Sequence, residues 1–184
     1  MLRSTLFLSL FGLLFPAVHG QTGNRFIQNK GQWPREVTHQ LQVSGAVIWA
    51  EANGWTLDMY DTRAIAALHA AHAGKGNDLA SPSIRHHAVR MRFRGASEQV
   101  LVEGVGKLPG TINYILGNDA TRWAGDVPSY SELRYTGIHP GVDMVLRRAG
   151  AGTKYDIIVA ANADPSPIAF TFAGADGLEL REGE

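Results

Sequence analysis

Apolar and polar residues alternate along most of the chain, in short runs separated by glycine, proline and asparagine. The segment 37–60, VTHQLQVSGAVIWAEANGWTLDMY, alternates throughout and breaks at Ser44-Gly45 and at Asn53-Gly54. A period of two residues is typical of a strand with one buried face, and an Asn-Gly pair suits a tight hairpin. This segment therefore predicts three antiparallel strands joined by two turns.

The same alternation returns in the second half of the chain. In residues 86–95, HHAVRMRFRG, apolar side chains take one phase and arginines take the other, as in a half-buried strand. Residues 118–128 are expected to form a loop. Further strands are expected over residues 100–105, 111–116, 129–135, 142–148, 154–160 and 168–172.

One segment changes period. Residues 62–73, TRAIAALHAAHA, carry apolar side chains at helical spacing; Asp61 or Thr62 can cap the start, and Gly74 can end the helix. About ten strands with this one short helix predict a mostly-β protein, with an antiparallel β-sandwich as its architecture.

The N-terminus has the layout of a secretory signal peptide. Arg3 precedes an apolar run over residues 6–15, and small residues follow up to Gly20. The run is shorter than the roughly 20 residues that cross a bilayer. We expect cleavage after Gly20, no stable membrane insertion afterwards, and a secreted or cell-surface protein that starts at Gln21.

Composition narrows the class of protein further. The 164 residues from 21 to 184 are enough for one domain with its own core. That segment has no cysteine and carries 16 basic and 17 acidic side chains, so it has no general attraction to nucleic acid. Its last eight residues, GLELREGE, resemble a strand cut near a turn, so we expect the N-terminal piece of a longer protein.

Two aspartates are the best candidates for chemistry. The shortest hairpin through AGAG pairs Arg148 with Thr153, which places Asp143 and Asp156 on one face as diagonal neighbours roughly 7 to 8 Å apart. Two carboxyl groups at that range suit a carbohydrate-active enzyme or a carbohydrate-binding module, or part of a calcium site. In the structural interpretation, Asp156 instead neutralises Arg147.

Turn chemistry favours the structural interpretation. Pro140-Gly141 forms a tight entry into the strand, Asp143 can accept hydrogen bonds from turn amides, and Asp164 stands at the exit before Pro165. The residues expected to support the turns and the hairpin are Pro140, Gly141, Asp143, Asp156 and Asp164.

An arginine stripe is the candidate binding site. Arg90, Arg92 and Arg94 share one strand face, where they suit an anionic polymer such as an acidic polysaccharide, or simply form the solvated face of a strand. Aromatic residues offer either a platform for sugars or parts of the core. These residues are Trp33, Trp49, Trp55, Trp123, Tyr114, Tyr130 and Tyr135.

The histidines do not form a recognisable metal motif. His69 and His72 share a helical face without a third ligand at a diagnostic spacing, and His86 and His87 should point to opposite strand faces. No nucleophile elbow, phosphate loop or zinc-protease motif is present. We therefore predict no metal, no cofactor and no catalytic residues.

Four stretches in fixed order carry a family resemblance. They are FIQNKGQWP, LPGTINYILGND with Trp123 behind it, VPSYSELRYTGIHPGVDMVL, and KYDIIVAANADPSPIAFTFAGADGL. Together they resemble an uncharacterised N-terminal domain of secreted bacterial proteins, which often continue into β-propeller-type (SBBP) repeats, adhesin-like domains or a gliding-motility-associated C-terminal sorting domain. The resemblance implies an extracellular module of unknown function and supplies no catalytic residues.

The sequence thus predicts an exported, non-catalytic β-sandwich module, structural or ligand-binding, at the N-terminus of a cell-surface or secreted protein. Its expected partners are a surface glycan or other components of the cell envelope. The alternative is a carbohydrate-active enzyme or carbohydrate-binding module that uses Asp143 and Asp156.

Overall fold

The computed structural model describes residues 25–67, 84–115, 117–150, 152–177 and 179. This part of the chain is mostly β, as the alternation predicts, and it includes a short 3-10 turn, η1 (Ala120–Arg122). The strands are β1 (Phe26–Gln28), β2 (Val37–Val43), β3 (Ala46–Glu51), β4 (Gly54–Tyr60), β5 (His86–Phe93), β6 (Leu101–Lys107), β7 (Ile112–Tyr114), β8 (Ala124–Val127), β9 (Ser129–His139), β10 (Val142–Ala149), β11 (Gly152–Val159) and β12 (Phe170–Ala173).

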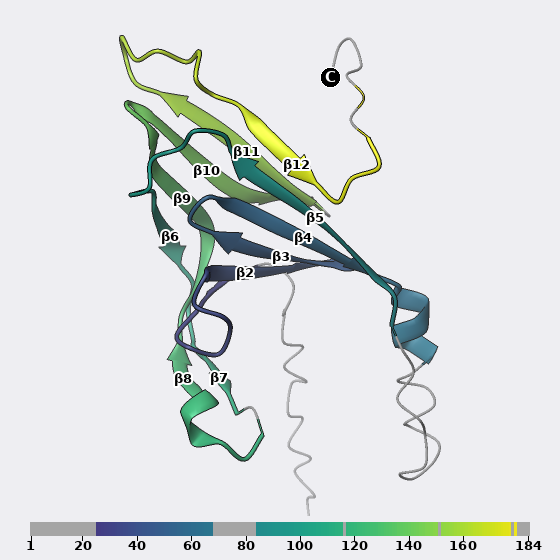
Figure 1. The fold of residues 1–184 in the computed structure, drawn as a ribbon. Helices are drawn as coiled ribbons and strands as arrows, with labels where there is room; N and C mark the ends of the chain where they lie inside the picture. Colours follow the sequence, from purple (N-terminus) through teal and green to yellow (C-terminus); the bar gives the residue numbers. More distant parts are fainter. Residues whose placement is uncertain (1–24, 68–83, 116, 151, 178, 180–184) are drawn as a thin grey trace, which may run out of the picture.

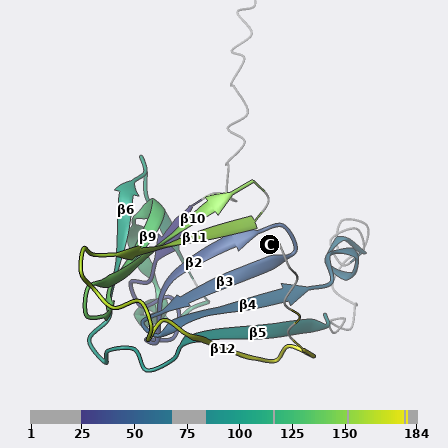
Figure 2. The ribbon, with the colours of Figure 1, turned by 90° about the horizontal axis from the view of Figure 1, so that it is seen from above.

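Ten strands form one antiparallel sheet that curls around the core (Figures 1 and 2). Its order is β11-β10-β9-β1-β2-β3-β4-β5-β12, and β6 also pairs with β9. The curl brings distant parts of this order together: the rings of Trp55 on β4 and Tyr155 on β11 have centroids 5.7 Å apart. The architecture is therefore a half-barrel.

The predicted β-sandwich is not confirmed, because one short strand joins the two halves. Phe26 of β1 pairs with Leu41 of β2 on one side and with Tyr130 of β9 on the other. A sandwich would leave these halves as separately hydrogen-bonded sheets. β1 is only three residues long, too short for alternation to reveal, so the sequence did not predict this connection.

The first three strands of the β2–β5 meander follow the pattern of the sequence. β2 pairs with β3 across the predicted Ser44-Gly45 turn. The next turn occupies Ala52-Asn53, one residue earlier than predicted, and Gly54 already pairs with Glu51 as the first residue of β4. The meander thus supplies one wall of the half-barrel.

The core lies on the concave face of the sheet. Tyr135 of β9 is fully buried, packs edge-on against Phe93 of β5 at 5.4 Å, and donates its hydroxyl to the carbonyl oxygen of Gly54. The other large, fully buried side chains of this cluster are Phe26, Leu41, Leu133, Met144 and Leu146. Because these side chains come from both halves of the sheet, the halves share one core.

A smaller cluster lies on the other face of β1. Side chains alternate along a strand, so Ile27 points away from Phe26 and packs with Ala124 and Val127. These two residues belong to β8, which pairs with β7 in a separate two-stranded sheet (Figure 1). The sequence predicted a loop where η1 and β8 occur, since four-residue strands carry little alternation.

The predicted helix is described only at its start. Residues 62–67 are helical, and the Asp61 carboxylate caps them by accepting hydrogen bonds from the amides of Arg63 and Ala64 at 3.0 and 3.2 Å. The rest of the predicted helix and the predicted signal peptide lie outside the described residues. Within the described part, no helix is both long and apolar enough to span a bilayer.

Candidate functional site

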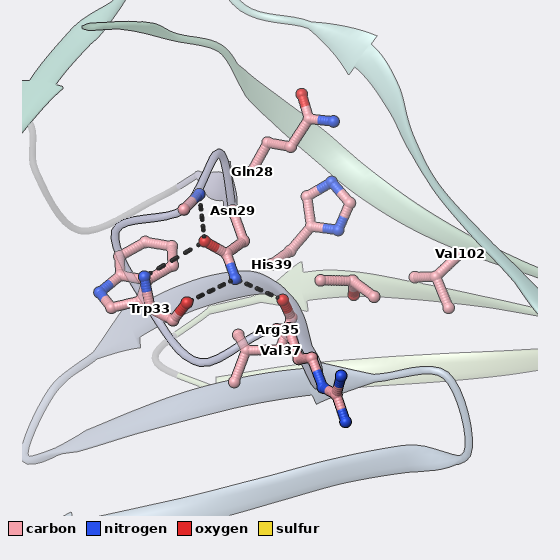
Figure 3. A pocket seen from close by; sticks show the side chains of 9 residues that line it. Gln28, Asn29, Trp33, Arg35, Val37, His39 and Val102 are labelled. Atoms are coloured by element: carbon pink, nitrogen blue, oxygen red, sulfur yellow. Dashed lines mark hydrogen bonds between the residues drawn. The ribbon is translucent and has the colours of Figure 1, made fainter. Parts of the chain in front are cut away.

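A loop held by one asparagine follows β1 (Figure 3). The Asn29 side-chain oxygen accepts hydrogen bonds from the amides of Gly31 and Trp33 at 3.0 and 3.2 Å. Its side-chain nitrogen donates to the carbonyls of Trp33, Pro34 and Val37 at 3.2, 2.9 and 2.7 Å. One side chain thus fixes the path of the chain from β1 to β2.

Gln32 fixes the other side of this loop. Its buried side chain accepts from the amide of Lys30 and donates to the carbonyl of Gln28, both at 2.7 Å. Gly31 has a φ of 107°, which side chains with a Cβ rarely adopt. These bonds give a structural reason for the stretch QNKGQ.

Trp33 anchors the loop to the smaller cluster. Its ring packs edge-on against Trp49 at 5.6 Å and against Tyr114 at 5.4 Å. Edge-on aromatic pairs of this kind contribute roughly 0.5 to 1.5 kcal/mol each beyond the area they bury. The loop is therefore attached at both its hydrogen-bonded end and its aromatic end.

The anchored loop forms one side of an open groove with a volume of about 610 Å³. Ligand sites for small molecules typically measure about 300 to 1,000 Å³, so the groove has the size of a binding site. It is lined by Gln28, Asn29, Gly31, Trp33, Arg35, Val37, Thr38, His39 and Val102.

His39 is the unusual side chain of this groove. Only 3% of its surface is exposed, and neither ring nitrogen has a hydrogen-bond partner within the described chain. Tyr130 packs edge-on against the ring, with centroids 5.8 Å apart. Burial lowers the pKa of His39 to about 4, so at neutral pH the imidazole is uncharged and offers one donor and one acceptor.

The remaining polar groups add little charge. The Gln28 side-chain oxygen accepts a long hydrogen bond, 3.4 Å, from the Tyr130 hydroxyl. Arg35 is the only cationic side chain among the lining residues; its side chain is 94% exposed and pairs with Glu36 at 3.2 Å. The lining residues include no carboxylate. The groove is thus nearly neutral.

The two candidate aspartates lie elsewhere, on the outer face of the β10–β11 hairpin. The register pairs Asp143 with Ile158 and Asp156 with Val145, as the shortest hairpin predicts. Asp156 contacts Arg147 and Lys154, both at 3.1 Å. Both of its oxygens are thus engaged by cations.

Asp143 stabilises an irregularity of β9. The pairing of β9 with β10 shifts between Val142 and Met144. There the Asp143 carboxylate accepts a hydrogen bond from the amide of Gly137 at 2.9 Å and lies 3.8 Å from Arg134. The amide therefore comes from a bulge in the preceding strand, whereas the sequence pointed to the adjacent Pro140-Gly141 turn.

The other predicted turn residues occupy the expected turns. Gly141 has a φ of 72° between β9 and β10, directly after Pro140. Asp164 accepts hydrogen bonds from the amide and the hydroxyl of Ser166 at 2.9 and 2.7 Å, and these bonds lower its pKa. Asp164 thus stabilises its own turn, because its partner Ser166 is only two residues away.

The arginine stripe is divided by the fold. Arg92 is half-buried; it contacts Glu51 at 2.5 Å and donates to the carbonyls of Trp55 and Met91. Arg90 and Arg94 remain exposed. The middle member therefore holds β3, β4 and β5 together, and the three guanidinium groups do not form one continuous free surface.

The histidine pairs form no metal site among the described residues. His86 contacts Asp58 at 2.9 Å, and no group of three potential metal ligands occurs in the described ranges. His69 and His72 lie outside these ranges.

The position of His39 in the alternating pattern of β2 is unusual, although the sequence analysis did not identify this residue. In VTHQLQV, His39 shares its phase with Val37 and Leu41, so a polar ring occupies an apolar position. The role of Asn29 has no such signal, because its hydrogen bonds depend on how the loop folds back.

Comparison with known proteins gives a family without an assigned activity. A family model described as "Domain of unknown function (DUF7948)" matches residues 26–184. No curated protein and no solved structure matches the chain. The match agrees with the resemblance to an uncharacterised domain, while the association with SBBP repeats or a gliding-motility sorting domain stays a prediction. The chain belongs to the DUF7948 family of domains of unknown function.

Proposed function

We propose that this domain is an exported, non-catalytic binding module, placed at the N-terminus of a cell-surface or secreted protein, and that the groove beside His39 is its ligand site. The groove supports this proposal because its volume lies in the range of ligand sites and because the hydrogen bonds of Asn29 fix the loop along its rim.

The observation that carries the proposal is the unpartnered His39 ring. A buried polar group without a hydrogen bond costs about 1 to 3 kcal/mol, so most such groups have partners. An apolar residue would fit the phase of β2 without that cost. A ligand that bonds to the ring provides a reason to keep a histidine there.

No observation favours the alternative enzyme. Asp156 is engaged by Arg147 and Lys154, and Asp143 by Gly137 and Arg134. Neither aspartate lines the groove. Both carboxylates are thus engaged by contacts within β9, β10 and β11.

A ligand screen tests the proposed site. Saturation-transfer NMR on the purified protein would use mixtures of small sugars, carboxylates, phosphates and amines. We expect at least one class to bind the parent and to lose its signal with His39→Leu. The matched control is His139→Leu, because His139 is also buried with an unpartnered Nε2 but lies outside this groove. Binding unaffected by His39→Leu would show that the groove is not the site.

The export part of the proposal has its own test. Mass spectrometry of protein recovered from the medium or the cell surface should give Gln21 as the first residue, because Gly20 ends a signal-peptide pattern. A protein recovered there with Met1 intact would contradict the predicted cleavage.

A further inference from the structure

The hydrogen-bonding groups of the groove select the chemistry of the ligand. A neutral imidazole offers one N–H donor and one acceptor nitrogen. A hydroxyl group is itself both donor and acceptor, so hydroxyls can satisfy both ring nitrogens of His39. A carboxylate or phosphate only accepts and an ammonium only donates, so each would leave one ring nitrogen unpaired.

The charge of the groove points the same way. A cationic ligand would meet no carboxylate among the lining residues, and an anionic ligand would meet one guanidinium, that of Arg35, which Glu36 already contacts. Anion sites usually combine several cations or a cluster of backbone amides. An uncharged ligand therefore fits best.

The shape and the apolar lining add a further restriction. Gln28, His39 and Val102 all line the groove, and Gln28 lies opposite His39 in the β1–β2 pairing (Figure 3). Val37 and Val102 supply apolar surface next to these polar groups. A sugar ring also has apolar C–H faces bordered by hydroxyls, and an open groove accommodates one unit of a longer chain.

From these features we propose that the groove binds an uncharged sugar residue within a glycan, with hydroxyl groups bonded to His39 and the Gln28 amide. This inference rests on the groove being a ligand site, as proposed above.

Binding requires a small local movement. The ring nitrogens of His39 are covered by neighbouring atoms in the structure without ligand. Gln28 is suited to uncover them, since its side chain is only partly buried and its hydrogen bond to Tyr130 is long. Gln28 lies opposite His39 in the β1–β2 pairing, so we expect rotation of this side chain to open access to the ring and to free an amide that can donate to the sugar.

A glycan array tests the ligand class on the purified protein. The array carries neutral oligomers of glucose, mannose, galactose and N-acetylglucosamine, together with uronic-acid and sulfated oligomers. We expect binding to one or more neutral oligomers, and calorimetry with the best of these gives its Kd. His39→Leu should weaken that binding by roughly tenfold to a hundredfold, since two hydrogen bonds are lost. The control His139→Leu should keep the Kd of the parent, and thermal melts verify that both variants fold.

The outcomes separate this inference from the proposed function. Binding only to acidic oligomers, abolished by Arg35→Ala, would overturn the neutral-sugar class while leaving the groove as the site. Neutral binding that His39→Leu leaves unchanged would overturn both. No glycan binding, with NMR hits of another class that His39→Leu removes, would overturn the sugar alone. No ligand in either experiment would overturn both proposals, and His39→Leu melting lower than the parent would then show that the ring stabilises the fold without a ligand.

Discussion

His39 occupies an apolar position of β2, and we expect its buried, unpartnered ring to make the fold less stable there than an apolar residue would. Its neighbours on the same phase, Val37 and Leu41, are apolar, and its ring nitrogens lack partners within the described chain. Residues that lower stability without a structural benefit are typical of functional sites. Because the ring is buried, the free energy of unfolding should depend on whether His39 is protonated.

Acidification should destabilise the protein through His39. The unfolded chain binds a proton at this residue near pH 6.5, whereas burial lowers the pKa in the folded chain to about 4. Between these values the unfolded state holds more protons, so the free energy of unfolding falls as pH falls, by about 3 kcal/mol over the whole window. The side chains that face this ring are those of Tyr130, which packs on it, and of the groove residues, among which Arg35 is the cation.

Urea unfolding of the parent and of His39→Leu measures this contribution. At about pH 7 the variant should be as stable as the parent or more stable, and between about pH 6.5 and 4 it should lose less stability. His87→Leu, at an exposed position of β5, serves as the control and should follow the parent. Parallel pH curves for all three proteins would show that His39 is not the group that titrates.

Asp143 should prove structural, and two substitutions separate its contacts. Asp143→Asn keeps an oxygen that accepts from Gly137 but loses the charge near Arg134, so we expect a loss of roughly 1 kcal/mol. Asp143→Ala also leaves the Gly137 amide unpaired and should cost roughly 2 kcal/mol.

Asp156→Asn should cost roughly 1 kcal/mol or less, because its ion pairs lie near the surface. Thermal melts measure all three variants. An Asn variant that melts like the parent but abolishes a glycan-cleaving activity of the parent would establish the enzyme instead.

At the scale of elements, the close approach of β4 to β5 at Gly54 limits which residue the meander can carry there. Gly54 begins β4 with a φ of 125°, and a Cβ built there would lie 2.2 Å from the carbonyl oxygen of Met91 on β5. Its own carbonyl accepts from the buried Tyr135 hydroxyl. The first residue of β4 therefore connects the meander to both β5 and β9.

Gly54→Ala should consequently destabilise the protein by about 3 kcal/mol or more, because the backbone has to shift as well as accept a strained φ. The matched control is Gly177→Ala, where no atom lies within 4 Å of the added Cβ and no positive φ is involved. The control should change stability by no more than about 0.5 kcal/mol. Equal melting temperatures for the two variants would contradict this account of Gly54.

At the scale of the whole molecule, alternation and turn residues predicted the local pairings but not the closure of the sheet. The pairings of β2 with β3 and of β3 with β4, and the register of the β10–β11 hairpin, follow from patterns within about 25 residues. The connection through β1 pairs Phe26 with Tyr130, which is more than 100 residues away in the sequence. β1 is only three residues long, so its sequence shows no measurable alternation. The groove depends on that connection, so the sequence indicated only the unusual phase of His39.

The connection through β1 leads to a prediction about unfolding. β1 hydrogen-bonds to both halves of the sheet, and the halves also share the Phe93–Tyr135 and Trp55–Tyr155 ring contacts. Neither half can bury its apolar face without the other, so we expect one cooperative transition in urea. Tryptophan fluorescence, which reports mainly on the β2–β5 half and the Trp33 cluster, and far-UV circular dichroism, which reports on all strands, should give the same midpoint. Separate midpoints would mean that the halves fold independently and that the β1 pairing is too weak to couple them.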